Sequence, residues 1–225
     1  MTTFQRARSE EQRAQRRQAI LDTAGAMLTE LPVAQLSLNE LSRRVGLAKS
    51  NVLNYFESRE AVLLELLISE LETWTAELGG AVDARVDPAA PLPERAGQLT
   101  DTVIATLLAR PMLCTLISAQ AAVLEHNIST EAALAFKRGA AASYGDMIRA
   151  VLTGLPELGE DGAGRFIATA GLLAGALWTH AHPADAILAA YDTDPSLAPL
   201  RIEFGPALRD ALDAQLRGLL TPWPT

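Results

Sequence analysis

The sequence contains few residues of the kinds that form disulfides, bind metals or carry out nucleophilic catalysis. Cys114 is the only cysteine among 225 residues, so no disulfide can form within the chain. There are three histidines, His126, His180 and His182. Between His182 and Asp185 there is no cysteine or carboxylate that could join the last two as a metal ligand. We therefore expect no metal, no cofactor and no catalytic residues, and a helical enzyme is the less favoured alternative.

Long hydrophobic runs are also missing. The two longest uncharged stretches, Pro111 to Leu124 and Phe166 to Thr179, have 14 residues each, whereas a membrane-spanning helix needs about 20. The N-terminal arginines are followed by further charged residues and not by an apolar segment, which speaks against a secretory signal peptide. We expect a cytoplasmic protein with no membrane partner.

Patterns typical of β-strands are absent as well. Alanine and leucine dominate, β-branched residues are scattered and no alternating run persists, so the sequence predicts an all-α fold. Ser9 and Gln12 resemble a capping box that begins a first helix, and this helix should end at Leu31 because Pro32 follows. A loop rich in Gly, Pro and Ala is predicted from Gly79 to Pro93. Further helices are predicted at about 59–78, 94–109, 112–125, 130–153, 161–181 and 206–220, with a broken helical segment near 184–191.

Charge is divided unevenly along the chain. The formal net charge is −8, which by itself argues against a nucleic-acid partner. Residues 1–60, however, carry a net charge of +2, while residues 61–225 carry −10. A basic N-terminal part on an acidic body is typical of a DNA-binding domain joined to a domain with another role.

Two short helices joined by a glycine turn are predicted inside this basic part. Ser37 and Glu40 form a capping box that begins a helix over Ser37–Val45, and Gly46 can end it with a positive φ. A second short helix follows at about Ala48–Phe56. Such a pair is a helix-turn-helix, in which the first helix crosses the phosphate backbone and the second enters the major groove.

The outward face of the second helix is polar. Lys49, Ser50, Asn51, Asn54 and Tyr55 lie on it. Asparagine pairs well with adenine and lysine with guanine, so this face is suited to base readout. From the pattern alone, the less favoured alternative is that these side chains simply face water.

The stretch from Arg17 to Leu67 resembles the DNA-binding domain of TetR-family repressors. Several features coincide in order: Ile20-Leu21-Asp22 in the first helix, the capped second helix with its Gly46 turn, Tyr55-Phe56 after the recognition helix, and Ser58-Arg59-Glu60 at the start of the fourth helix. The resemblance implies an all-α subunit with an N-terminal three-helix DNA-binding domain and a larger C-terminal domain for ligand binding and dimerisation. The implied divisions are a flexible arm at 1–14, a DNA-binding domain at 15–60 with its motif at 37–56, and an effector-binding and dimerisation domain at 61–225.

The same resemblance assigns roles to individual positions. The residues that fall where the family reads bases or nearby backbone are Asn39, Lys49, Ser50, Asn51 and Asn54. Those that fall where it holds phosphates are Ser37, Tyr55 and Arg59, and Arg44 is a further phosphate candidate, although a solvated role is the alternative. Three positions depart from the common pattern. Ala48 replaces a capping serine, Ser50 replaces a frequent glycine, and Leu53 replaces a frequent tyrosine and so removes one phosphate contact. The arginines before Arg17 either reach a minor groove or belong to a disordered tail.

In the C-terminal part the resemblance is one of architecture only. A small-molecule effector is expected among the helices there, in a mainly apolar pocket whose candidate lining residues are Trp74, Met112, Cys114, Ile117, His126, Phe136, Tyr144 and Trp178. Packing in the core is the alternative for each of them. The expected homodimer interface uses the helices at about 161–181 and 206–220, with candidate residues Phe166, Gly171, Gly175, Leu208, Leu212 and Leu216.

The function predicted from these features is that of a dimeric transcriptional repressor. The expected partners are double-stranded operator DNA with a palindromic sequence, an unidentified small effector that releases the protein from it, and a second copy of the chain. An architectural DNA-binding protein without a ligand switch is the main alternative, but it would be basic throughout, and this chain is not.

Overall fold

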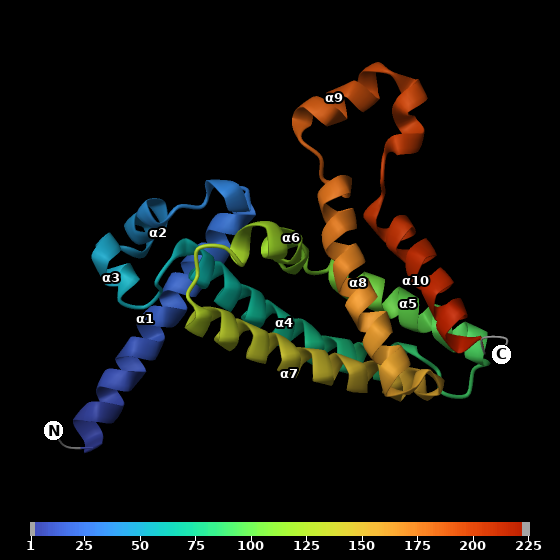
Figure 1. Cartoon of the computed structure of the whole chain (residues 1–225), viewed down its shortest axis with the longest axis horizontal. Coiled ribbons are helices and arrows are strands. Elements are labelled where there is room, and N and C mark those ends of the chain that lie inside the picture. Colours follow the sequence, from blue (N-terminus) through green and yellow to red (C-terminus); the bar gives the residue numbers. More distant parts are fainter. Residues whose placement is uncertain (1–2, 222–225) are drawn as a thin grey trace. The chain divides into compact units, whose positions relative to one another are not determined.

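The structure is a computed structural model that describes the backbone of residues 3–221 and the side chains of residues 10–221. The all-α prediction is confirmed, because the described chain contains helices and no strand (Figure 1). The α-helices are α1 (Thr3–Glu30), α2 (Leu38–Val45), α3 (Lys49–Leu53), α4 (Arg59–Arg85), α5 (Leu92–Leu108), α6 (Pro111–Ala119), α7 (Thr130–Gly154), α8 (Gly159–Ala181), α9 (Asp185–Thr193) and α10 (Phe204–Leu220). Short 3₁₀ turns lie at η1 (Val33–Gln35), η3 (Pro156–Leu158) and η4 (Pro195–Leu200), and a π-helical turn lies at η2 (Gln120–Leu124).

The chain forms two compact units. The first contains residues 1–69 and 119–137, and the second contains residues 70–118 and 138–225. The division therefore passes through α4 and α7. It is a division by contacts between residues, so it does not test the predicted boundary at residue 60 between the DNA-binding and effector-binding domains. Within residues 3–221 no single helix is long and apolar enough to span a membrane. Helix α5 and residues 111–124 together have the length and composition of a span, but the pair is bent by 88°.

Local sequence signals position the helices of the first unit. The backbone N–H of Glu40 donates to Oγ of Ser37 at 3.2 Å, and Gly46 ends α2 with a φ of 75°. Ser58 begins α4 by accepting from the backbone N–H of Ala61 at 3.1 Å. These caps confirm the predicted boundaries, as does the end of α1 two residues before Pro32. At the start of α2 and of α4, one of the first backbone N–H groups is thereby satisfied by a serine three residues earlier.

Three predicted boundaries are wrong. Helix α1 begins at Thr3 and not at Ser9, and the recognition helix α3 is shorter than expected, ending at Leu53. The predicted loop from Gly79 to Pro93 is mostly helix, since α4 continues to Arg85. The apolar stripe explains this last error, because Leu78, Val82 and Val86 continue at a spacing of four and are all buried. Their burial outweighs the cost of about 1 kcal/mol that a glycine adds inside a helix.

The core of the second unit is built where α10 packs against α8 and α5. Buried side chains on α10 face buried residues of both neighbours; they are Phe204, Leu208, Leu212 and Leu216 on α10, Leu99, Val103 and Leu107 on α5, and Phe166, Ile167 and Ala170 on α8. Side-chain hydrogen bonds join further helices: Trp74 Nε1 of α4 donates to Thr106 Oγ1 of α5 at 3.1 Å, and the Tyr144 hydroxyl of α7 donates to the Gly164 carbonyl of α8 at 2.6 Å.

Helix α9 and the turn η4 project as a hairpin beyond the ends of α8 and α10 (Figure 1). Neither α9 nor η4 contains a buried residue. Several of their side chains are nonetheless large and apolar, with Ile187 exposed by 46% and Leu200 by 64%.

Two glycines of the second unit should respond to alanine in opposite ways. At Gly154 an added Cβ would lie 2.9 Å from Cγ1 of Val82, so Gly154→Ala should lower the free energy of unfolding by about 1–3 kcal/mol through overpacking. At Gly80, in the interior of α4, an added Cβ meets no atom within 4 Å, and Gly80→Ala should raise stability by about 0.5–1 kcal/mol. Urea unfolding of both variants checks this. Equal effects of the two changes would contradict the packing described here.

Candidate nucleic-acid interface

The recognition helix α3 has one buried and one open face. Val52 is fully buried, while Lys49, Ser50 and Asn51 are exposed, and so is Asn54 directly after the helix. Ala48 occupies the N-cap position without a side-chain hydrogen bond, so the backbone N–H groups of the first turn receive no side-chain cap. Exposed Lys, Ser and Asn side chains on one short helix provide the donors and acceptors that base edges require. Asn39 of α2 is exposed as well.

Arg17 of α1 fixes the end of this recognition segment. Its Nη1 donates to the Tyr55 carbonyl at 2.6 Å, its Nε donates to Oε1 of Glu65 at 2.7 Å, and Nη2 bonds the other carboxylate oxygen. The guanidinium also lies 4.2 Å from the ring centre of Phe56, which is itself buried. One side chain therefore joins α1, the residues after α3 and the first turns of α4, so that the angle of α3 is set by contacts on its inner side.

Two further arginines of α1 lie beside the recognition helix, and the sequence interpretation did not assign them a defined contact. Arg13 and Arg16 line a cavity of about 470 Å³ together with Asn51, Asn54 and Tyr55. Arg13 donates to the Asn54 carbonyl at 3.2 Å, and its guanidinium lies 5.3 Å from the ring centre of Tyr55. The arginine-rich composition before residue 17 was the available signal, but only the contacts in the structure show that these residues lie beside α3.

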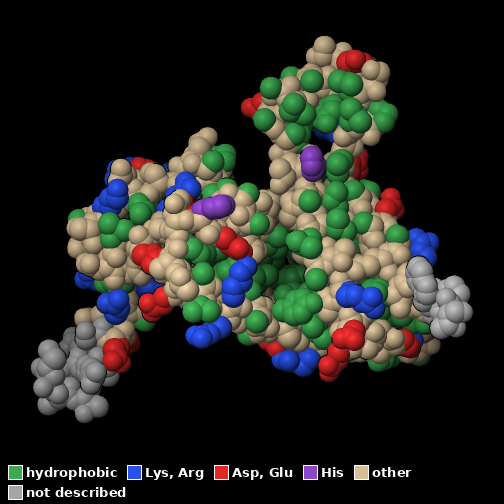
Figure 2. All heavy atoms as spheres, in the orientation of Figure 1, with side chains coloured by type: hydrophobic (Ala, Val, Ile, Leu, Met, Phe, Trp, Pro, Cys, Tyr) green, Lys and Arg blue, Asp and Glu red, His purple; other side chains and the backbone are tan. Residues whose placement is uncertain are grey.

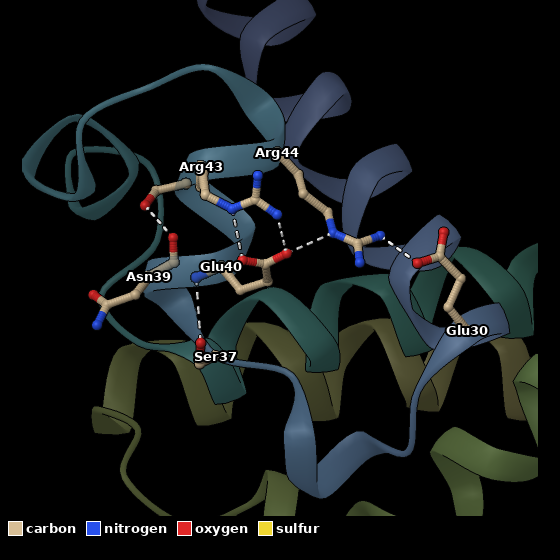
Figure 3. A network of polar contacts seen from close by, with 7 residues as sticks. Glu30, Ser37, Asn39, Glu40, Arg43 and Arg44 are labelled. Carbon is tan, nitrogen blue, oxygen red and sulfur yellow. Dashed lines mark hydrogen bonds and ion pairs between the residues drawn. The ribbon is translucent and has the colours of Figure 1, made fainter.

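Arg44 takes part in an ion-pair network within the first unit (Figure 3). Its Nη1 lies 2.6 Å from Glu30 of α1, and its Nε lies 2.9 Å from the Glu40 carboxylate, which also accepts from Arg43. The guanidinium groups of Arg43 and Arg44 lower the pKa of the Glu40 carboxyl from 4.5 to about 2. The carboxylate of Glu40 is thus engaged by these arginines, and it does not complete the predicted capping box. Arg44 is therefore held between two carboxylates, and its role as a phosphate ligand stays a prediction.

Arg59 bonds groups of its own chain. Its Nη1 donates to the Leu36 carbonyl at 3.1 Å and to the Ala34 carbonyl at 3.4 Å, and its Nε donates to Glu60 at 2.9 Å. The guanidinium therefore joins the turn before α2 to the start of α4, and its role as a phosphate ligand stays a prediction. Of the other two phosphate candidates, Ser37 is exposed and accepts the cap bond of α2, and Tyr55 is half-buried.

The eight effector-pocket candidates are divided between the two units, with His126 and Phe136 in the first and the other six in the second. Phe136 lines a cavity in the first unit, and His126 is exposed. Most of the others are used in packing or internal hydrogen bonds: Trp74, Tyr144 and Trp178 each donate to an oxygen atom of a neighbouring helix, Ile117 lies against Gly175, and Cys114 is buried. Burial raises the pKa of the Cys114 thiol to about 12. Among the described side chains, no group of three or more His, Cys, Asp or Glu residues could hold a metal ion.

Five of the six predicted interface residues lie inside the subunit, which corrects that assignment. Phe166, Leu208, Leu212 and Leu216 are buried in the contact of α10 with α8 and α5, and an added Cβ at Gly175 would lie 3.1 Å from Ile117 of α6. At Gly171 an added Cβ would meet nothing within 4 Å, so this position stays open. The apolar stripes of α8 and α10 are buried, but against helices of the same chain and not against a second copy.

Comparison with known proteins identifies the family. The sequence of residues 68–222 matches the family described as "Tetracyclin repressor-like, C-terminal domain". The chain belongs to the TetR family of transcriptional regulators. The matched region is the part for which the sequence alone offered only an architectural resemblance, and the helix-turn-helix precedes it, so the two observations are independent.

Solved structures of TetR regulators share this fold. The fatty acid degradation regulator FadR from Bacillus halodurans is 15% identical with a TM-score of 0.54, and the match covers 90% of this chain and 95% of that one. The TetR family repressor AlkX from Dietzia sp. strain DQ12-45-1b, implicated in biodegradation of n-alkanes, is 12% identical with a TM-score of 0.51, and the match covers 91% and 97%. No curated protein matches the sequence. At these identities the likeness concerns the fold.

The network around Glu40 makes the stability of this TetR regulator depend on pH. Because the folded-state pKa of Glu40 is below its ordinary value, the ion pairs stabilise the fold fully above about pH 4.5 and progressively less as the pH falls towards 2. Glu40→Gln should therefore be less stable than the wild type at pH 7, and the difference between their urea midpoints should shrink from pH 4.5 downward. A difference that stays constant between pH 7 and pH 3 would contradict this.

Proposed function

We propose that this TetR regulator is a repressor that reads a palindromic operator through the exposed face of α3. The observation that carries the proposal is the pairing of a buried Val52 with exposed Lys49, Ser50 and Asn51 on a helix whose end is held by Arg17. A helix held from its inner side presents its outer side chains in fixed positions, and this is the requirement for reading base edges in the major groove.

In this proposal the arginines that contact phosphates are Arg13 and Arg16, which differ from the arginines that the sequence indicated. Arg13 and Arg16 flank Asn51, Asn54 and Tyr55 in the cavity beside α3, and Arg16 is exposed. Their charges would hold the DNA backbone next to the bases that α3 reads. Arg44 and Arg59 support the domain from within.

The repressor acts as a homodimer in this proposal, because a palindromic operator requires two recognition helices related by symmetry. The outward face of α8 supports it: Leu172 is exposed by 77%, and the small residues Ala168, Gly171 and Ala176 beside it permit close approach of a second helix. Hydrophobic side chains also gather over the α9–η4 hairpin (Figure 2). Exposed apolar surface of this kind is typical of protein contacts.

A small, mainly apolar effector that releases the operator completes the proposal. It is supported by the family of the C-terminal part and by the apolar composition of the second unit. Such a ligand shifts DNA affinity only by the difference between its own affinities for the bound and free states. An architectural protein without a ligand switch remains the second candidate, although the acidic charge of residues 61–225 does not favour it.

Removal of single base-reading side chains should weaken operator binding without unfolding the protein. For Lys49→Ala and Asn51→Ala we expect dissociation constants raised about 5- to 150-fold, corresponding to about 1–3 kcal/mol per bidentate contact. Anisotropy titration against an operator recovered from a random DNA pool measures this. Both side chains are exposed, so the urea midpoints should not change; unchanged affinity in both variants would contradict the assignment.

A phosphate-binding arginine should behave differently from a base-reading residue. Arg16→Ala should weaken binding to all sequences alike and reduce the slope of log affinity against log salt concentration by about one. Arg138→Ala, an exposed arginine of the second unit, serves as the control and should leave the slope unchanged.

The proposed dimer depends on the outward face of α8. Leu172→Glu should raise the dimer dissociation constant at least about tenfold, because a charge would be buried in an apolar contact. Sedimentation velocity over a range of protein concentrations measures the change. Leu134→Glu, which replaces a leucine exposed by 50% on α7, is the matched control. A monomeric wild type, or equal behaviour of the two variants, would contradict the proposed interface.

A further inference from the structure

A cavity of about 490 Å³ lies within the first unit, beside residues 53–57. Its walls come from Arg17 of α1, residues 53–57 after and at the end of α3, the first turns of α4, and residues 129–136 at the start of α7. The volume falls in the range of about 300–1,000 Å³ that is usual for small-molecule sites. All of these residues belong to one compact unit, so the cavity does not depend on how the two units are placed.

The floor and one wall of this cavity are apolar. Leu64 and Phe136 are buried beneath it, Ile68 is half-buried, and Leu53 is exposed by 43%. Leu53 stands where the family frequently has tyrosine, and its side chain cannot hydrogen-bond to a base edge or a phosphate. On the cavity wall it adds apolar surface that an apolar ligand would cover.

The charged residues that line the cavity are mostly acidic. Glu57, Glu65 and Glu131 line the cavity, and Arg17 is the one basic residue among its lining residues. Arg17 is already committed to Glu65 and to the Tyr55 carbonyl, so it has little capacity to attract an anion. Glu57 accepts from the backbone N–H of Ser129 at 2.6 Å, and Glu131 is exposed with no partner among the described residues. Two carboxylates are therefore left without a balancing cation.

We infer that this cavity is a binding site for small amphipathic organic cations. The apolar portion of the ligand lies against Leu53, Ile68 and Phe136, and its positive group lies at the mouth beside Glu57 and Glu131. An anionic amphiphile of the same length would meet the uncompensated carboxylates and bind more weakly. Because Leu53 belongs to α3, a ligand in this site touches the recognition helix directly. The site does not rest on the proposed operator binding.

The probe for this inference is decyltrimethylammonium, titrated into the full-length protein by calorimetry below its micellar concentration and in the absence of DNA. We expect saturable binding of one molecule per chain, and at least about tenfold weaker binding of decanoate. Absence of saturable binding, or binding of decanoate as tight as that of the cation, would overturn the inference. Neither result bears on the operator titrations.

Two variants, each with a control, test whether the probe binds in this cavity. Ala135→Trp fills it from an exposed position of α7 and should weaken binding at least about tenfold, whereas Ala141→Trp on another face of the same helix should not. Glu131→Gln should weaken binding up to about fivefold, the usual range of one exposed charge interaction, and Glu160→Gln in the first turn of α8 is its control. If Ala135→Trp and Glu131→Gln both bind the probe as the wild type does, the site assigned here is wrong.

Discussion

The side chain of Arg17 is the contact on which the arrangement of the first unit depends. It bonds the Tyr55 carbonyl and the Glu65 carboxylate and lies over the Phe56 ring, so it connects α1 with the end of the recognition segment and with α4. A guanidinium can do this because it has several donors in a fixed plane and an apolar face, which lysine lacks. With the inner side of α3 held in this way, its polar side chains remain free to meet DNA. Arg17 also lines the cavity of about 490 Å³ in the first unit.

Much of the first unit could be predicted from the sequence because its signals are local. Ser37, Gly46 and Ser58 act within a few residues of their own positions, and the structure confirms each of them. The roles of Arg44 and Arg59 could not be predicted in this way. Whether an arginine faces a phosphate or a carbonyl of its own chain depends on residues such as Glu30 and Leu36, which are distant in sequence.

In the second unit the sequence showed which faces are apolar but not what covers them. The stripe on α10 was correctly recognised as buried, yet it packs on α5 and α8 of the same chain and is not available to a second copy. The pair Gly79-Gly80 does not end α4, since the buried stripe of Leu78, Val82 and Val86 continues past it. The family match over 68–222 shows what class of protein the chain is. The proposed effector and the proposed dimer contacts depend on surfaces that a single sequence does not reveal.

The central claim is that individual side chains of α3 read individual base pairs. It is tested most directly by measuring the affinity of wild type and Asn51→Ala for every single-base variant of the selected operator. We predict an inverted repeat in which Asn51→Ala loses discrimination at one base pair of each half-site and keeps it at the others. If Asn51→Ala shows the same base preferences as the wild type at every position, α3 does not read the operator as described.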